Sequence, residues 1–355
     1  MIKMNKQQYM DELKKALEGK TLSHEADKIM DYYEQYFDDA NDFGRSDDEV
    51  SQEFGSPQTL ADEVLEGLTM MRQDLFNGQV PLRLIDCVLL DIRVHLVISS
   101  REEVYVTYQG NEKFNEEVLN VDLRGDHLFI RQKKQRLLNF NTFYQPNQVK
   151  PYLLIEVPQS YRGRLQVKTK DSRIVVDGSN LESKCKFDLQ SKNARIIGEQ
   201  LICHEVVMLS QRGRIDLEDS KAKTLSLTCD EGRIQLVNVE AKYLCAHNKE
   251  GRIMVNKGHY ELAELVNEEA KIVVEDALID DCRMENEEGR CSYVLNDNPC
   301  GLHLDLLSRQ GKVIINGVKF NKGIPLIRDV RPQKKEKKFL NLYVRSSTGR
   351  IEIEH

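Results

Sequence analysis

The sequence lacks the features that mark membrane and secreted proteins. No uninterrupted apolar run approaches the ~20 residues needed to cross a lipid bilayer. The nearest stretch, residues 81–98, is interrupted at five positions, Arg83, Asp86, Asp91, Arg93 and His95. Residues 1–19 are polar and have no apolar segment ahead of a small-residue cleavage site, so we expect no signal peptide. These absences predict a cytoplasmic protein.

Motifs for metals, disulfides and phosphates are also missing. The chain has eight cysteines, but none forms a C-x-x-C pair, and their spacing fits neither a zinc site nor a disulfide framework. Cys282 and Cys291 replace aliphatic residues in the apolar pattern described below, as reduced and buried thiols do. No glycine-rich phosphate-binding loop occurs. We therefore expect neither a metal nor another cofactor.

Negative charge is concentrated at the amino-terminal end of the chain. Residues 1–75 hold 18 acidic and 8 basic residues, a net charge of −10, whereas the whole chain carries −7. The remainder is therefore slightly basic. An acidic surface repels phosphates, so this segment is not expected to bind nucleic acid, and it would suit a basic protein partner.

The rest of the chain is organised around a repeat of nineteen residues. A basic residue, here called the anchor, stands at each of six positions nineteen apart. These positions are Arg195, Arg214, Arg233, Arg252, Lys271 and Arg290. Steps of twenty-two lead back to Arg173 and forward to Lys312, and Arg350 follows Lys312 by thirty-eight, twice the period. A fixed short period is the signature of a solenoid.

Pairs of apolar residues spaced by two accompany each anchor, such as Val206 and Met208 before Arg214 and Ile215 and Leu217 after it. This alternation turns one face of a β-strand inward. Each repeat therefore predicts two short strands joined by a turn at the small residue before the anchor. A weaker apolar column eight residues after the anchor suggests a short third side. Stacked at ~4.8 Å, the repeats predict a mainly β protein, a parallel β-helix with continuous apolar columns. An antiparallel sandwich would give irregular spacing.

Three segments are expected along the chain. Residues 1–76 have the pattern of an acidic bundle of short helices, with Ser46 and Ser56 as helix caps and the last helix reaching about Phe76. Residues 77–160 are rich in strands outside the nineteen-residue spacing, and we expect them to form the first coils and to cap the solenoid. Residues 161–355 form the solenoid proper. A basic insert at 317–338 replaces one coil and is interpreted as a loop.

Three stretches, Asn5 to Leu13, Ile29 to Phe37 and Glu53 to Pro57, together resemble the bacterial HAAS signalling module over about residues 4–68. The resemblance implies a regulatory rather than a catalytic module, commonly linked with PadR-like transcriptional regulators. Members of that family often continue into transmembrane helices. Here Asn77 to Gln79 lead directly into predicted strands.

The region from about Leu82 to the end resembles a bacterial family of β-strand-repeat proteins that carries an adhesin label. The resemblance rests on Ile155 to Pro158, on Leu165 to Ile174 and on the closing stretch Ser346 to Ile353. It implies a β-solenoid fold. A HAAS module joined to this repeat is a combination known from Gram-positive bacteria.

Candidate binding residues come from two charged segments. In the helical segment, Tyr32 should remain exposed because Tyr33, Tyr36 and Phe37 fill the inward face. The candidates for binding a protein partner are Tyr32, Asp38, Asp39, Asp47 and Asp48. In the insert, a lysine-rich run could bind an anion, although such blocks are more often solvated loops. These lysines are Lys334, Lys335, Lys337 and Lys338.

Two further patterns are interpreted as structural. The anchors could bind a polyanion, but acidic residues two positions earlier should neutralise them. These are Asp171, Glu231, Glu250, Glu269 and Glu288. Neighbouring cysteines and histidines, such as Cys203 and His204, lack the orienting group and oxyanion site that nucleophilic catalysis needs. Cys245 and His247 should face solvent, since Ala246 between them falls on a core column. No catalytic residue is predicted.

The sequence thus favours a non-enzymatic cytoplasmic regulatory protein, in which the helical module engages a protein partner and the solenoid is a rigid scaffold. The resemblance implies a PadR-like regulator as that partner. Two alternatives stay open. A surface-associated adhesin would require export, and a carbohydrate-active β-helix enzyme would require carboxylates clustered in a groove.

Overall fold

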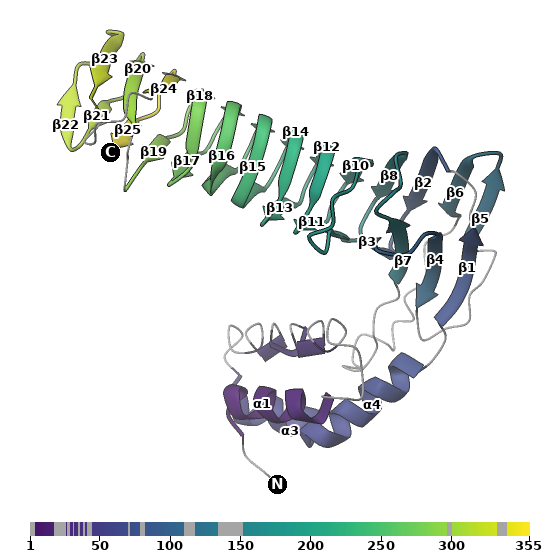
Figure 1. Ribbon diagram of the computed structural model, residues 1–355. Coiled ribbons are helices and arrows are strands. Elements are labelled where there is room, and N and C mark those ends of the chain that lie inside the picture. Colours follow the sequence, from purple (N-terminus) through teal and green to yellow (C-terminus); the bar gives the residue numbers. More distant parts are fainter. Residues whose placement is uncertain are drawn as a thin grey trace. The chain divides into compact units, whose positions relative to one another are not determined.

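The protein was analysed as a computed structural model. It describes residues 4–17, 26, 29–30, 32–34, 36–37, 40, 45–69, 72–78, 82–109, 118–133, 152–296, 300–331 and 339–355. These residues form two compact units, a helical module and a solenoid of β-strands (Figure 1).

The helical module contains α1 (Lys6–Leu17), α3 (Asp47–Phe54) and α4 (Pro57–Thr69), and the described residues between 26 and 40 are also helical. Its core is the apolar stripe that the spacing predicts. Phe54 is at the centre of an aromatic cluster, with ring centroids 4.8 to 6.1 Å from its own. The four rings around it are Tyr9, Tyr33, Tyr36 and Phe37.

Both predicted helix caps are confirmed. Ser46 and Glu49 form a reciprocal capping box at the start of α3, and the Ser56 hydroxyl accepts a hydrogen bond from the Thr59 amide at the start of α4. The last helix is shorter than expected, because it ends at Thr69 rather than near Phe76. Residues 72–78 instead form strand β1, and Phe76 packs against the solenoid core.

The solenoid consists of strands that are mostly stacked in parallel. In chain order these are β1 (Arg72–Gly78), β2 (Leu84–Leu89), β3 (Arg93–Ser99), β4 (Val104–Gln109), β5 (Leu119–Arg124), β6 (His127–Gln132), β7 (Tyr152–Pro158), β8 (Arg164–Thr169), β9 (Ile174–Asp177), β10 (Lys186–Ser191), β11 (Ile196–Glu199), β12 (Ile202–Ser210), β13 (Arg214–Glu218), β14 (Lys221–Cys229), β15 (Arg233–Asn248), β16 (Arg252–Asn267), β17 (Ile272–Glu275), β18 (Leu278–Asn286), β19 (Cys291–Val294), β20 (Gly301–Ser308), β21 (Val313–Ile315), β22 (Val318–Phe320), β23 (Leu326–Val330), β24 (Phe339–Ser346) and β25 (Ile351–Glu354). The protein is therefore mainly β, as predicted.

Equivalent positions of successive coils lie directly above one another. Ile215 pairs with Ile234, which pairs with Ile253, and that residue pairs with Ile272. All four side chains are completely buried. Cys291 continues this column and Cys282 the neighbouring one, so both thiols occupy core positions as predicted. The nineteen-residue period therefore corresponds to one turn of the coil.

A column of buried polar side chains runs along the solenoid beside the turns that precede the anchors. Four residues before the anchor stand short polar side chains, and the amide nitrogens of Asn248, Asn267 and Asn286 donate to a backbone carbonyl of the preceding coil, at 2.8 to 3.1 Å. Each carbonyl belongs to the residue just before the preceding anchor. The Ser308 hydroxyl makes the same kind of bond to the Gly349 carbonyl at 2.7 Å. The column gives turn carbonyls of the interior a side-chain donor, and the Gly232 carbonyl accepts from the Arg252 amide as well.

The coils at the carboxyl-terminal end do not stack in the order of the sequence. Strand β24 lies between β18 and β20, and β25 lies between β19 and β21 (Figure 1). The coil formed by residues 339–354 is therefore enclosed by two coils that precede it in the chain. The stack is continuous here, so no coil is missing where the repeat is interrupted.

The amino-terminal end has the same construction. Strand β2 lies between β6 and β8, and β3 lies between β7 and β9. The first coil in the sequence is thus the second coil of the stack. Antiparallel pairing of β5 with β6 then covers part of the outermost coil.

The basic insert contains two strands among its described residues, 317–331. Its described residues fold back as strands β22 and β23, which pair antiparallel with β21 and β20. Asn316 and Gly317, both with positive φ, form the tight turn into β22. The expected loop is therefore corrected to a strand-built cover on the last coil of the stack.

Candidate functional site

Among the described residues, four of the nine anchors form ion pairs, but not with the predicted acidic residues. Asp216 is 8% exposed and contacts the guanidinium groups of both Arg195 and Arg233. Glu352, 7% exposed, contacts those of Arg290 and Arg350 in the same way. These acids follow an anchor by two positions. A strand alternates its faces, so such a residue lies on the same face as the anchor and bridges adjacent coils.

The predicted acidic residues take other roles. Asp171 accepts a hydrogen bond from Asn193 at 2.5 Å and pairs with Lys170 at 3.3 Å, and these contacts lower the pKa of its carboxyl group. Within the described part of the chain, no ion pair joins an anchor to Glu231, Glu250, Glu269 or Glu288. These side chains lie at the turn, before the strand begins.

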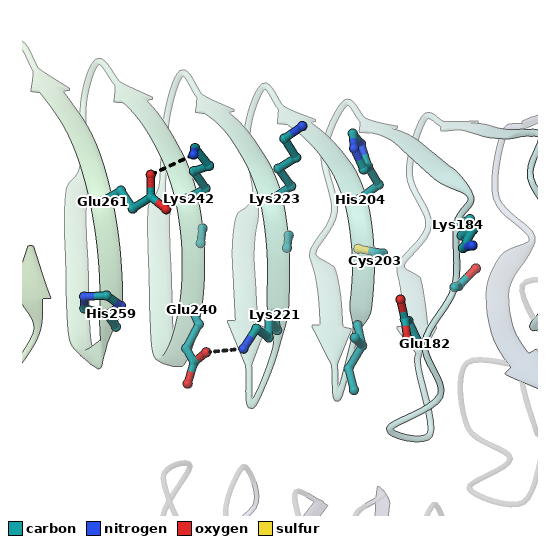
Figure 2. A pocket seen from close by; sticks show the side chains of 14 residues that line it. Glu182, Lys184, Cys203, His204, Lys221, Lys223, Glu240, Lys242, His259 and Glu261 are labelled. Atoms are coloured by element: carbon teal, nitrogen blue, oxygen red, sulfur yellow. Dashed lines mark ion pairs between the residues drawn. The ribbon is translucent and has the colours of Figure 1, made fainter.

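A groove runs along the short third side of the coils. Its volume is about 580 Å³, and it crosses the coils that contain β12, β14, β15 and β16 (Figure 2). The floor is formed by Cys203, Ala222 and Ala241, residues of the weak column eight positions after the anchor. The alanines leave the floor low, whereas longer side chains one position before and after them form the walls.

The two walls carry charges of both signs. Figure 2 shows one wall with Lys184, His204, Lys223 and Lys242, and the other with Glu182, Lys221, Glu240 and His259. Lys221 pairs with Glu240 at 2.8 Å, and Lys242 pairs with Glu261 at 3.0 Å. Glu261 thereby raises the pKa of the Lys242 ammonium group. Among the described residues, Lys184 and Lys223 have no carboxylate within ion-pair distance.

The groove holds no activated nucleophile. Burial raises the pKa of the Cys203 thiol well above its ordinary value, so it is protonated at neutral pH, and His204 projects from the wall instead of toward it. The Glu240 and Glu261 carboxylates are each held by a lysine of a neighbouring coil. No group of three metal-ligating side chains occurs among the residues that the structure describes. The arrangement provides hydrogen bonds and ion pairs for binding.

Three of the five predicted partner-binding residues of the helical module lie among the described residues. Tyr32 is 46% exposed, and its ring packs edge-on against Tyr33. Asp47 accepts a hydrogen bond from the Lys6 amide at 2.9 Å and so caps α1. Asp48 lies in the first turn of α3 and is half-buried. Asp38 and Asp39 lie outside the described residues, as do Lys334, Lys335, Lys337 and Lys338. Their binding roles stay predictions.

Labelling of cysteines tests which thiols are buried in the folded protein. All eight thiols are free, and Cys245 is the exposed one. Ala246 beside it is completely buried, which confirms the predicted orientation. Burial raises the pKa to about 11 for Cys229 and to about 12 for Cys185 and Cys291. Partial burial and the Glu264 carboxylate raise the pKa of Cys245 too. Because it is the exposed thiol, iodoacetamide at pH 8 should still label this one site ahead of the others.

Mass spectrometry of the folded protein measures this stoichiometry. Cys245→Ser should abolish the rapid phase, and denaturant should make the remaining thiols reactive. Rapid labelling of Cys282 or Cys291 in the folded chain would contradict the core assignment.

Comparison with known proteins identifies both units. The family described as Toastrack DUF4097 matches residues 88–322, more than half of the 355 residues, and the HAAS family matches residues 8–63. The chain belongs to the Toastrack DUF4097 family and carries a HAAS domain at its amino-terminal end. No curated protein matches it significantly.

Two solved structures are similar to the chain. One is described as a "putative adhesin" from Bacteroides fragilis, with 12% identity, coverage of 81% of this chain and 98% of that one, and a TM-score of 0.43. The other, a "putative cell adhesion protein" from Clostridium sporogenes, has 11% identity, coverage of 80% and 99%, and a TM-score of 0.25. At these values the likenesses carry no functional argument.

Proposed function

We propose that the protein is a non-enzymatic cytoplasmic interaction protein, in which the HAAS module binds a protein partner and the solenoid serves as a rigid scaffold. The HAAS match carries this proposal, because it covers the helical module and implies a regulatory role for it. The module also presents an exposed aromatic residue, Tyr32, on a strongly acidic segment. Aromatic side chains are frequent anchors of protein interfaces.

The partner that this module suits best is a basic protein, and a PadR-like transcriptional regulator is the specific proposal. The groove supports binding over catalysis, since two of its carboxylates are held in ion pairs and its half-buried thiol has a raised pKa. Among the described residues, no helix has the length and apolar character that crossing a bilayer requires.

Co-purification of the full chain with its native-host proteins tests the proposal. Tyr32→Asp should reduce recovery of a PadR-like regulator, identified by mass spectrometry, by roughly tenfold, because an interface aromatic is replaced by a charge. The matched control is Tyr243→Asp, which changes a similarly exposed tyrosine on the solenoid. Recovery of the regulator that is unchanged by Tyr32→Asp, or equally lost in both variants, would refute the assignment to this module. Recovery of the native protein on the cell surface would favour the adhesin alternative.

A further inference from the structure

The most exposed apolar side chains of the described residues are gathered at one end of the solenoid. Strand β22 forms a hairpin with β21, and β23 pairs antiparallel with β20. Residues 318–331, which comprise β22, β23 and their connection, are here called the hairpin cap. Ile327 is 78% exposed, and Val318 and Ile324 are each 59% exposed. The other large exposed apolar side chains are between 36% and 46% exposed. Such a concentration marks an interaction surface.

These three side chains are not needed to close the stack. Phe320, Leu326 and Val330 of the same hairpin cap already pack against the core. Strand β22 pairs with β21 and β23 pairs with β20, and no described strand pairs with the outer edge of either. An apolar, unpaired edge favours association unless a partner covers it.

The charge of the hairpin cap selects the partner. Lys319, Lys322, Arg328 and Arg331 are all exposed and form no ion pair with a described residue. The acidic residue, Asp329, is held by His303 at 2.6 Å. Two hairpin caps would therefore repel each other, whereas an acidic surface would be attracted.

The same chain supplies such a surface. Residues 1–75 carry a net charge of −10 and present the exposed Tyr32. Helices α3 and α4 contain acidic residues and no basic one, and Glu53 and Asp62 among them are exposed. We propose that the hairpin cap of one copy binds the helical module of a second copy. The inference rests on the proposed function, since it makes the helical module a protein-binding element. Because the two surfaces differ, the contact is head-to-tail and can be repeated from copy to copy.

Sedimentation velocity of the full chain tests the proposal over a wide range of protein concentration. The wild-type protein should self-associate, and high ionic strength should weaken the association because exposed charges are screened. Ile327→Asp should raise the dissociation constant at least roughly tenfold, as loss of an apolar anchor does. The matched control, Leu209→Asp on β12, should associate like the wild type. Both variants should melt at the wild-type temperature, since both side chains are exposed. A wild-type chain that stays monomeric at every concentration overturns the proposal.

Mixing separates a head-to-tail contact from other arrangements. A chain with Glu53→Lys and Asp62→Lys should be monomeric, as should the Ile327→Asp chain. The mixture should form dimers and nothing larger, because one intact helical module meets one intact hairpin cap. If the helical-module variant still self-associates alone, the contact is between two hairpin caps and the proposal is wrong. If the wild-type chain is monomeric but still recovers the PadR-like regulator, this inference is wrong and the proposed function still holds.

Discussion

Replacing Ile234 with aspartate should unfold the solenoid or lower its melting temperature sharply. Ile234 is completely buried in β15, with Ile215 on one side and Ile253 on the other. The side chains stacked against it are apolar and fully buried, so a carboxylate there would be desolvated without a partner. We expect the free energy of unfolding to fall by about 4 kcal/mol or more, as is typical when an unpaired charge is buried.

Chemical denaturation followed by circular dichroism measures this loss. Tyr243→Asp is the matched control, since it introduces the same side chain at an exposed position of the same strand, with the uncharged Thr224 and Leu262 opposite it. The control should lose at most a few tenths of a kcal/mol, within the usual range for surface substitutions. Equal denaturation midpoints for the two variants would contradict the assignment of the core column.

Deleting residues 339–355 should release the preceding coil as well. Strand β24 separates β18 from β20, and β25 separates β19 from β21, so their removal takes away the main parallel neighbour of the outermost coil. Five side chains that the deletion removes are essentially fully buried: Leu340, Leu342, Val344, Ile351 and Ile353. At about 1.5–3 kcal/mol for each, the deletion costs on the order of 10 kcal/mol of local stability.

Hydrogen exchange resolves the effect by segment. Amides of residues 301–330 should exchange rapidly in the deletion variant, while those of residues 214–275 should stay protected. The matched control lacks residues 297–355 and should show the same protection of 214–275. Slow exchange of 301–330 after the shorter deletion would mean that β20 can pair directly with β18, against our expectation.

The architecture could be predicted from the sequence because one physical pattern recurs many times. Ile215, Ile234 and Ile253 occupy equivalent positions in successive coils, so each repeat independently predicts the same strand. The helices of the helical module could be predicted for a similar reason, since Ser46 and Ser56 mark helix starts by local hydrogen bonding. Both kinds of signal depend on residues close together in the chain.

The order of the coils at the two ends could not be predicted in this way. Residues 339–354 fit the repeat equally well after Lys312 or before it, because all coils present similar apolar columns. The step of twenty-two between Arg290 and Lys312 provides extra length where the chain passes the enclosed coil. The same step between Arg173 and Arg195 joins adjacent coils, so length alone does not decide the order.

The groove and the ion-pair partners of the anchors could not be predicted from the sequence either. Ala222 and Ala241 belong to a predicted column, but the low floor becomes a groove only through Lys221, Lys223 and their equivalents on the next coils. The residues that hold the anchors, Asp216 and Glu352, occur once each in this position and not as a ladder. A single acidic residue gives no periodic signal.

The enclosed coil has a consequence for synthesis of the protein on the ribosome. Strands β20 and β21 emerge before β24 and β25, yet in the finished molecule they pair with those later strands and not with β18 or β19. A nascent chain that lacks residues 339–355 therefore cannot complete this end. The carboxyl-terminal part of the solenoid must stay open until those residues have been translated, whereas the middle coils can zip together one after another as they appear.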